Sequence, residues 1–198
     1  HGYLWMIPKE DGSANVGLVT IDGSKLKPLL DKFVKLKGWD KKNVTKVFGG
    51  PIPASGPVKN TVNDGLMLIG DAAGFTSPLF EGGTHLGIQS GLFAAKVAKK
   101  SIKNKDYSKK VLKEYYHLWH NEFPKYNKLV KGKDDIYSLS NKELAEFSDT
   151  MPKQLGKLTA SDKLFVLKNL FKNKKMLTRK TFRIFNAFKY SRSKKYGW

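Results

Sequence analysis

Residues 65–83 read GLMLIGDAAGFTSPLFEGG, and they decide how the rest of the chain is interpreted. Leu66–Ile69 is a continuous apolar run of strand length, typical of a strand that is covered on both faces in a parallel sheet. Gly70 and Asp71 follow directly, which places a carboxylate at the carboxyl edge of the sheet, where open α/β folds bind their ligands. The stretch therefore predicts a strand, a turn that binds a ligand, and a following helix.

The helix predicted after this turn, over residues 82–100, is rich in small residues such as Gly83, Gly87 and Ala94. Small side chains allow close approach of another backbone, although each glycine costs about 1 kcal/mol relative to alanine in a helix interior. The free N–H groups at the helix start favour an anion or a developing negative charge. Asp71 can accept hydrogen bonds from the hydroxyls of a sugar or ribityl chain.

The residues before this stretch predict a β-hairpin, a helix and a loop. Apolar and β-branched runs over residues 3–8 and 14–21 flank a turn at Asp11-Gly12. Ser24 is the predicted cap of a helix that stops at Gly38. Residues 43–57 predict a short strand that runs into a long loop punctuated by glycine and proline.

The residues after about Tyr107 predict helices, with breaks at Pro124, Gly132, Pro152 and Gly156. Thr159–Asp162 can start one helix, whose apolar residues include Leu164, Leu167, Leu170 and Phe171. The next helix should carry one apolar face and an opposite basic one. The apolar face would comprise Leu177, Thr181, Ile184, Phe185 and Phe188, and the basic face would comprise Arg179, Lys180 and Arg183.

Charge is distributed unevenly along the 198 residues, whose net charge is +20. Residues 1–95 hold ten Lys/Arg and eight Asp/Glu, whereas residues 96–198 hold twenty-seven and nine. The basic region permits a membrane-surface helix, nucleic-acid binding or a solvated helical bundle. No nucleic-acid motif is present, so we expect no nucleic-acid partner.

Several classes of protein are excluded or disfavoured by composition. The chain contains no cysteine, which excludes disulfides, thiolate metal sites and cysteine nucleophiles and favours an intracellular location. No apolar run is long enough for a transmembrane helix. Glu114, His117 and His120 loosely resemble metal-ligand spacing, but the aromatic surroundings favour packing or surface, and we expect no metal site.

A family resemblance is carried by three blocks of this sequence. Residues 64–95, DGLMLIGDAAGFTSPLFEGGTHLGIQSGLFAA, resemble the second flavin-binding segment of p-hydroxybenzoate hydroxylase-type oxidoreductases. Residues 2–19, GYLWMIPKEDGSANVGLV, and residues 49–57, GGPIPASGP, are similar to the carboxyl-terminal part of the geranylgeranyl reductase family. That family hydrogenates isoprenoid double bonds of archaeal membrane lipids and chlorophyll side chains.

The resemblance implies FAD as cofactor, reduced by an external electron donor such as NADPH or ferredoxin. It implies that Asp71 bonds the ribityl chain, that three neighbours shape the turn and that three further residues lie against the flavin ring. An aromatic strand and a nearby loop would line the substrate cavity. The implied cofactor residues are Gly70, Asp71, Ala72, Gly74, Pro78, Gly82 and Gly83, and the implied substrate residues are Tyr3, Trp5, Pro8, Gly49, Gly50 and Pro53. No residue stands out as a catalytic proton donor.

The sequence departs from the family pattern in two ways. Phe80 and Glu81 stand where the family commonly has Thr and Gly, which brings the segment closer to electron-transfer flavoprotein dehydrogenases. The G-x-G-x-x-G turn that holds the ADP half of FAD is also absent from this sequence. We therefore expect a piece of a longer protein whose amino-terminal half is missing here.

The predicted fold class is α+β: a fragment of an FAD-binding α/β flavoprotein followed by a helical carboxyl-terminal region. Residues 1–62 would belong to the substrate domain, 63–104 would form the second FAD-binding segment, and 105–198 the basic helical region. The expected function is FAD-dependent reduction of isoprenoid lipids by a cytoplasmic enzyme that is peripheral to the membrane. An electron-transfer flavoprotein dehydrogenase-like protein and a non-enzymatic basic module that binds membrane or nucleic acid are the alternatives.

Overall fold

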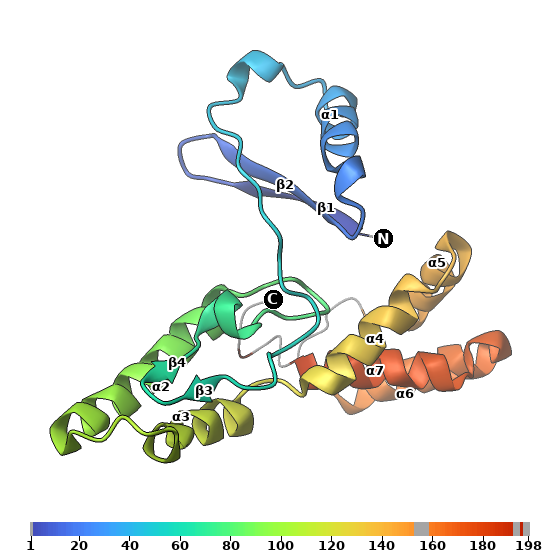
Figure 1. Ribbon diagram of the computed structural model, residues 1–198. Helices are drawn as coiled ribbons and strands as arrows, with labels where there is room; N and C mark the ends of the chain where they lie inside the picture. The colour runs from blue at the N-terminus through green and yellow to red at the C-terminus, as the bar shows by residue number, and fades with distance from the viewer. Residues whose placement is uncertain (1, 153–158, 192–194, 196–198) are drawn as a thin grey trace. The chain divides into compact units, whose positions relative to one another are not determined.

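The computed structural model describes residues 2–152, 159–191 and 195. They belong to two compact units, one ending at Gly50 and the other beginning at Pro51. Figure 1 labels the helices and strands of both units.

The first unit contains the predicted hairpin. Strand β1 (Gly2–Pro8) pairs antiparallel with β2 (Ala14–Thr20), and the turn between them contains Gly12 at φ +77°. Only glycine adopts such a positive φ without strain, which explains why the turn forms there. This prediction is confirmed.

Helix α1 (Leu26–Leu36) follows the hairpin, as predicted, but it is capped differently. A 3₁₀ turn over Gly23–Lys25 precedes it, and Asp22, not Ser24, supplies the capping side chain by accepting a hydrogen bond from the Ser24 N–H. Gly38, at φ +66°, ends the helix as expected. Asp22 thus caps the 3₁₀ turn, whereas Lys25 at the start of α1 makes no side-chain cap hydrogen bond, so the predicted Ser24 cap is wrong.

The short strand predicted near Val47 is not formed. Only a 3₁₀ turn over Lys41–Asn43 is present, and the described residues from 44 to 61 contain neither helix nor strand. Val47 and Phe48 are 80% and 82% exposed. A strand needs a neighbour to satisfy its backbone groups, and no described strand pairs with this segment.

The second unit begins its regular structure with a small antiparallel pair, β3 (Val62–Asn63) and β4 (Leu66–Met67). The prediction of a parallel strand covered on both faces is therefore wrong for Leu66–Ile69. Leu66 and Ile69 are exposed, and among the described residues β4 pairs with β3 alone. An apolar run fixes neither the number nor the direction of its neighbours, which explains the error.

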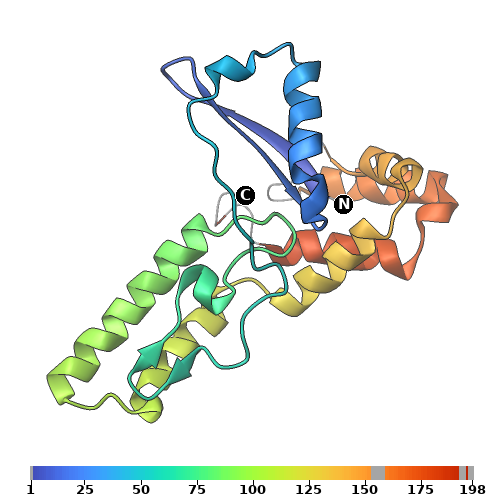
Figure 2. The same cartoon turned by 45° about the horizontal axis from the view of Figure 1, so that its top comes forward.

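Two long helices support the turn that follows β4. Helix α2 (Thr84–Asn104) lies alongside α3 (Lys109–Glu122), and both views show this pairing (Figures 1 and 2). Phe75, which is fully buried, packs against Trp119, Phe123 and Tyr126. The buried cluster comprises Val62, Ala73, Phe75, Leu86, Val97, Leu112, Tyr115, Trp119, Phe123 and Tyr126.

Four further helices complete the second unit. They are α4 (Tyr126–Tyr137), α5 (Asn141–Thr150), α6 (Ala160–Lys172) and α7 (Arg179–Ser191). Helices α4 and α7 lie side by side in Figures 1 and 2. A second buried cluster comprises Phe147, Val166, Leu170, Met176 and Ile184.

The predicted helix boundaries hold at some breaks and fail at one. Helices end before Pro124 and Pro152, and Thr159 forms a capping box with Asp162. Gly132 lies inside α4, so the break predicted there is wrong. A Cβ at this position would lie 2.1 Å from the Ala187 Cβ, which shows that the glycine allows α4 and α7 to approach closely. The break predicted at Gly156 lies outside the described residues.

The fold as described is α-rich, with short strands in two separate antiparallel pairs. It thus combines helices and strands, as the α+β class requires, while the strand contribution is smaller than predicted. Helices α2 and α3 hold the turn at residues 70–74, which is where the sequence predicts a ligand.

Candidate functional site

The turn after β4 is fixed to helix α2 by one buried hydroxyl group. The Ser90 hydroxyl accepts a hydrogen bond from the Gly70 N–H at 3.0 Å and donates one to the Gly87 carbonyl at 2.8 Å. Gly70 (φ +51°) starts a 3₁₀ turn that ends at Ala73, and Gly74 (φ +75°) closes it. The left-handed glycines and Ser90 together set where the next side chain points.

That side chain belongs to Asp71, which is exposed at the surface of the turn. Its Oδ1 accepts a hydrogen bond from the Thr76 hydroxyl at 2.8 Å. A carboxylate offers about four acceptor positions, so it retains capacity for hydroxyl donors of a ligand. Thr76 is itself buried, and it therefore holds the carboxylate in one orientation.

A cavity of about 320 Å³ opens beside this carboxylate. Glycine backbone forms much of its wall, and both Asp71 and Thr76 contribute to it. The lining residues are Ile52, Gly70, Asp71, Thr76, Glu81, Gly83, Thr84 and Gly87. The volume lies at the lower end of the range of about 300–1,000 Å³ that is usual for small-molecule sites.

The start of helix α2 forms one side of the cavity. Gly83 is the N-cap residue, and as a glycine it offers no side chain to the first N–H groups of the helix. These N–H groups and the helix dipole favour an anion or a group that gains negative charge. A Cβ on Gly83 would lie 3.0 Å from Asp71 Oδ1 and 3.1 Å from Thr76 Oγ1, so only glycine leaves this corner open.

A short loop over residues 77–82 closes another side of the cavity. Backbone hydrogen bonds from Ser77 N–H to Gly82 O (3.0 Å) and from Glu81 N–H to Ser77 O (2.8 Å) define it. Phe80 lies 5.7 Å from Phe188 of helix α7, measured between ring centroids. The loop is therefore packed against the carboxyl-terminal helices of the same unit.

Glu81 connects the same loop to helix α4. Its Oε1 accepts a hydrogen bond from the Tyr137 hydroxyl at 3.3 Å. Its backbone lies at φ +50°, a conformation uncommon for a residue other than glycine. Burial, with the nearby Glu81 carboxylate as a second cause, raises the pKa of Tyr137 to about 12. The cavity thus has two carboxylates, Asp71 and Glu81, in its wall.

The predicted cofactor residues separate into two groups. Gly70, Asp71 and Gly83 line the cavity. Ala72 is exposed on the same turn, whereas Gly74 and Pro78 are buried behind it. Gly82 belongs to the loop and accepts the Ser77 hydrogen bond.

The predicted substrate residues fall into both units. Tyr3, Trp5 and Pro8 lie on β1, and the rings of Tyr3 and Trp5 are 5.9 Å apart. The Trp5 ring covers Gly17, where a Cβ would lie 2.1 Å from a ring carbon. Gly49 and Gly50 end the first unit, and Pro53 lies near the start of the second. Because these residues are divided between two units, neither unit alone brings all of them together.

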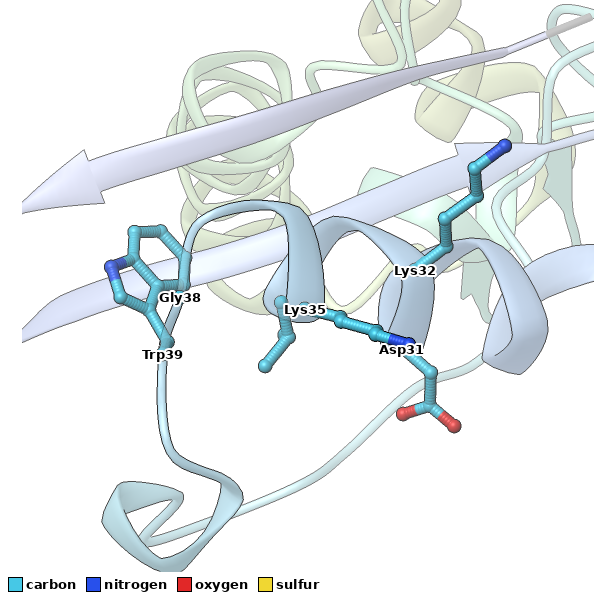
Figure 3. Close-up of a pocket in the computed structure, with 6 residues that line it drawn as sticks. Asp31, Lys32, Lys35, Gly38 and Trp39 are labelled. Atoms are coloured by element: carbon cyan, nitrogen blue, oxygen red, sulfur yellow. The ribbon is translucent and has the colours of Figure 1, made fainter.

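A larger open groove, of about 620 Å³, lies on the first unit and contains none of the predicted site residues. It follows one side of α1 and is lined by Asp31, Lys32, Val34, Lys35, Gly38 and Trp39. Figure 3 shows Gly38 and Trp39 at one end of the labelled residues and Asp31 and Lys32 at the other. The smaller cavity carries the predicted chemistry, and we therefore base the functional argument on it.

The described residues contain no group of three His, Cys, Asp or Glu side chains that could hold a metal ion. Glu114 forms an ion pair with Lys100 at 2.6 Å, and the ring of His120 stacks on Tyr116 with centroids 5.2 Å apart. His117 also contacts the Tyr116 ring, so all three residues of the loose metal-like spacing have packing or surface contacts.

Sequence reasoning missed Thr76 and Ser90 as residues that position the site. Ser90 lies seven residues after Gly83 and three after Gly87, which places all three on one helix face. That spacing could have identified it. The Thr76 hydroxyl gave no such signal, because its bond to Asp71 depends on the shape of the turn.

Comparison with known proteins identifies relatives of this chain. No family model matches it. A digeranylgeranylglycerophospholipid reductase of Methanococcus vannielii is 40% identical over 161 residues, covering 78% of this chain and 41% of the relative. The enzyme of that name from Methanocaldococcus jannaschii is 37% identical over 163 residues, with the same two coverages of 78% and 41%. The chain thus spans about two fifths of the length of these curated relatives.

The fold also has a match among solved structures. The crystal structure of a geranylgeranyl bacteriochlorophyll reductase-like protein from Thermoplasma acidophilum aligns with a TM-score of 0.67 and 28% identity. The alignment covers 88% of this chain and 47% of that protein. Sequence and structure therefore point to the same group of proteins.

Proposed function

Because this chain belongs to the geranylgeranyl reductase family, we propose that it forms part of an FAD-dependent oxidoreductase that reduces isoprenoid double bonds of membrane lipids. The observation that carries the proposal is the cavity beside Asp71. It combines a carboxylate for hydroxyl groups, a glycine wall and a helix start that favours negative charge. Residues 63–104 would be the second FAD-binding segment.

The residues present fit a flavin with its ribityl chain. The wall is made by glycine backbone at Gly70, Gly83 and Gly87, so a flat ring could approach it closely. At Gly83 a side chain would fill this space, since its Cβ would come within 3.0 Å of Asp71. Bound FAD, once reduced by the external electron donor, would supply the hydride for reduction of the double bond, and a proton would complete it.

Each part of the site has a role in this proposal. Asp71, oriented by Thr76, would bind ribityl hydroxyls, and the first N–H groups of α2 would stabilise negative charge on the ring. Tyr137 would hold Glu81 in the wall of the cavity. NADPH or ferredoxin would be the external electron donor.

The substrate in this proposal is an isoprenoid chain. The residues proposed to bind it are Tyr3, Trp5, Pro8, Gly49, Gly50 and Pro53. An apolar chain requires apolar and aromatic lining with few polar groups, which suits the exposed aromatic face of β1. Among the described helices, none is long and apolar enough to cross a membrane. We propose that the enzyme reaches its lipid from the membrane surface.

Titration of FAD with the purified chain, followed by quenching of flavin fluorescence, tests the proposal. Asp71→Ala should weaken binding by about tenfold or more, because a hydrogen bond to a charged group contributes about 1.5–3 kcal/mol. Asp134→Ala, which removes an exposed carboxylate from α4, is the matched control and should bind FAD as the wild type does.

The complete gene product should be titrated in the same way. FAD binding there that is weakened by Asp71→Ala, together with reduction of an isoprenoid double bond, would support the proposal. If the complete protein binds no FAD, or if Asp71→Ala and Asp134→Ala behave alike, the assignment of the flavin to this cavity is wrong.

A further inference from the structure

Helix α6 carries apolar side chains on two faces, and only one of these faces is packed inside the protein. Val166 and Leu170 point into the second buried cluster. Leu164 and Phe171, on the other side, are 67% and 66% exposed, and Leu167 is 47% exposed. The sequence pattern had placed Leu170 together with these three residues, whereas the structure separates it from them.

The three exposed residues form one stripe along the helix. Leu164, Leu167 and Phe171 are spaced at i, i+3 and i+7, so they lie above one another on the same face. Phe165, 47% exposed, lies about 100° around the helix from Leu164 and is outside this stripe. We call the face formed by Leu164, Leu167 and Phe171 the outer α6 face.

Lysines border the outer α6 face on both sides. Lys163 precedes the stripe on one side, and Lys168 and Lys172 follow it on the other; all three are exposed. Residues 163–191 carry nine Lys and Arg and no Asp or Glu. The surface therefore has an apolar centre and a basic border.

We propose that the outer α6 face docks on the surface of an anionic lipid bilayer. An interfacial helix has this arrangement, with apolar side chains that enter the acyl boundary and lysines that lie at the headgroups. Helix α7, where the sequence placed the membrane face, is unsuitable because Thr181, Ile184 and Ala187 are buried. Arg183 on that helix is also engaged, in a bidentate ion pair with Asp135.

The charge pattern favours a bilayer over other occupants. A second copy of this chain docked through the same face would bring two lysine borders together, which is unfavourable. Nucleic acid is bound mainly through its phosphates, and it would leave the apolar centre without a partner. An anionic bilayer offers acyl chains to the apolar centre and negatively charged headgroups to the lysine border. The proposal depends on the proposed function only in that a lipid substrate gives such docking a purpose.

Sedimentation of the purified chain with vesicles tests this surface. Vesicles of phosphatidylcholine alone and of phosphatidylcholine mixed with phosphatidylglycerol should be compared, without FAD. We expect the wild-type chain to bind the anionic vesicles. The Leu164→Ser/Phe171→Ser variant should bind them at least tenfold more weakly than the wild type. The control Leu92→Ser/Ile102→Ser removes two residues of α2 that are 60% and 62% exposed, and it should bind as the wild type does.

The basic border has its own variant. Lys168→Glu/Lys172→Glu should abolish the preference for anionic vesicles, and added salt should weaken wild-type binding. Melting temperatures of all variants show whether they fold. Repetition with the complete gene product tests whether the face is accessible there.

Several results would overturn the proposal. If the wild-type chain does not bind anionic vesicles, the proposal is wrong. It is also wrong if the Leu164→Ser/Phe171→Ser variant binds them as well as the control does. A wild-type dimer that this variant dissociates identifies a second copy as the occupant. A complete gene product that this variant destabilises by more than the control identifies another part of the same protein. Vesicle binding without FAD binding would support this surface and contradict the proposed function, so the two failures are distinguishable.

Discussion

At the scale of single residues, Gly83 and Gly91 are two glycines of the same region with opposite expected effects. Gly83→Ala should weaken FAD binding severalfold, because the new Cβ would lie 3.0 Å from Asp71 and 3.1 Å from Thr76. Gly91→Ala meets open space on α2 and should leave binding unchanged while it stabilises the fold by about 0.5–1 kcal/mol. Fluorescence titration and thermal melting measure both effects. Equal FAD affinity of the two variants would contradict the described corner.

Tyr137 provides a prediction about pH. Its pKa is raised to about 12, first by burial and then by Glu81. Glu81→Gln should lower this pKa while leaving it above the ordinary value, since burial remains. Because the folded pKa exceeds the unfolded one, Tyr137 contributes stability that is complete below about pH 10 and is lost as the pH rises toward 12.

Tyrosinate absorbance in the near ultraviolet measures this titration, with Tyr137→Phe identifying which step belongs to Tyr137. The stability of the wild type should also fall more steeply than that of Tyr137→Phe over this alkaline range. If Glu81→Gln does not alter the titration, the two side chains do not interact as described.

At the scale of elements, the packing of α4 on α7 depends on Gly132. Alanine is the better helix former, yet Gly132→Ala should destabilise the protein by about 1–3 kcal/mol through overpacking. Its Cβ would lie 2.1 Å from the Ala187 Cβ. Ala187→Gly should partly restore stability in the double variant, although it lowers the stability of the wild type. Denaturant unfolding of the four proteins measures this coupling; additive effects would show that the two positions do not touch.

Elements with local signals could be predicted from the sequence. The hairpin follows from Gly12 between an apolar run and a β-branched run, and the start of α6 follows from the Thr159–Asp162 capping box. Long-range contacts had no such signal. Gly132 looked like a helix break, and the Asp135–Arg183 ion pair joins residues 48 positions apart. Both depend on which helices meet, which sequence periodicity does not specify.

The candidate site was predictable in the same partial way. The strand end at Gly70 and Asp71, the helix start at Gly83 and the family resemblance together indicated three residues that line the cavity. The contribution of Thr76 requires the turn to fold back, and the position of Leu66 in a two-residue antiparallel strand depends on a partner strand. The chemical groups of the site could thus be predicted from the sequence, whereas the tertiary contacts that hold them in place could not.

At the scale of the whole molecule, all residues that line the cavity belong to the second unit, from Ile52 to Gly87. A chain that starts at Pro51 should therefore respond to FAD as the 198-residue chain does. Fluorescence titration of both proteins, with circular dichroism to verify helix content, measures this. A shortened chain that keeps its helices but no longer quenches the flavin would show that the first unit contributes to the site.

The contacts of the loop at residues 77–82 have a consequence for how the second unit responds to its ligand. Phe80 touches Phe188 and Glu81 bonds Tyr137, so the wall of the cavity is continuous with α7 and α4. A ligand that orders this loop must also slow the local opening of both helices, by thermodynamic linkage. Hydrogen–deuterium exchange should then show protection spreading to amides near Phe188, more than a hundred positions along the chain from Asp71. Ligand binding at the turn would thus be detectable in helix α7.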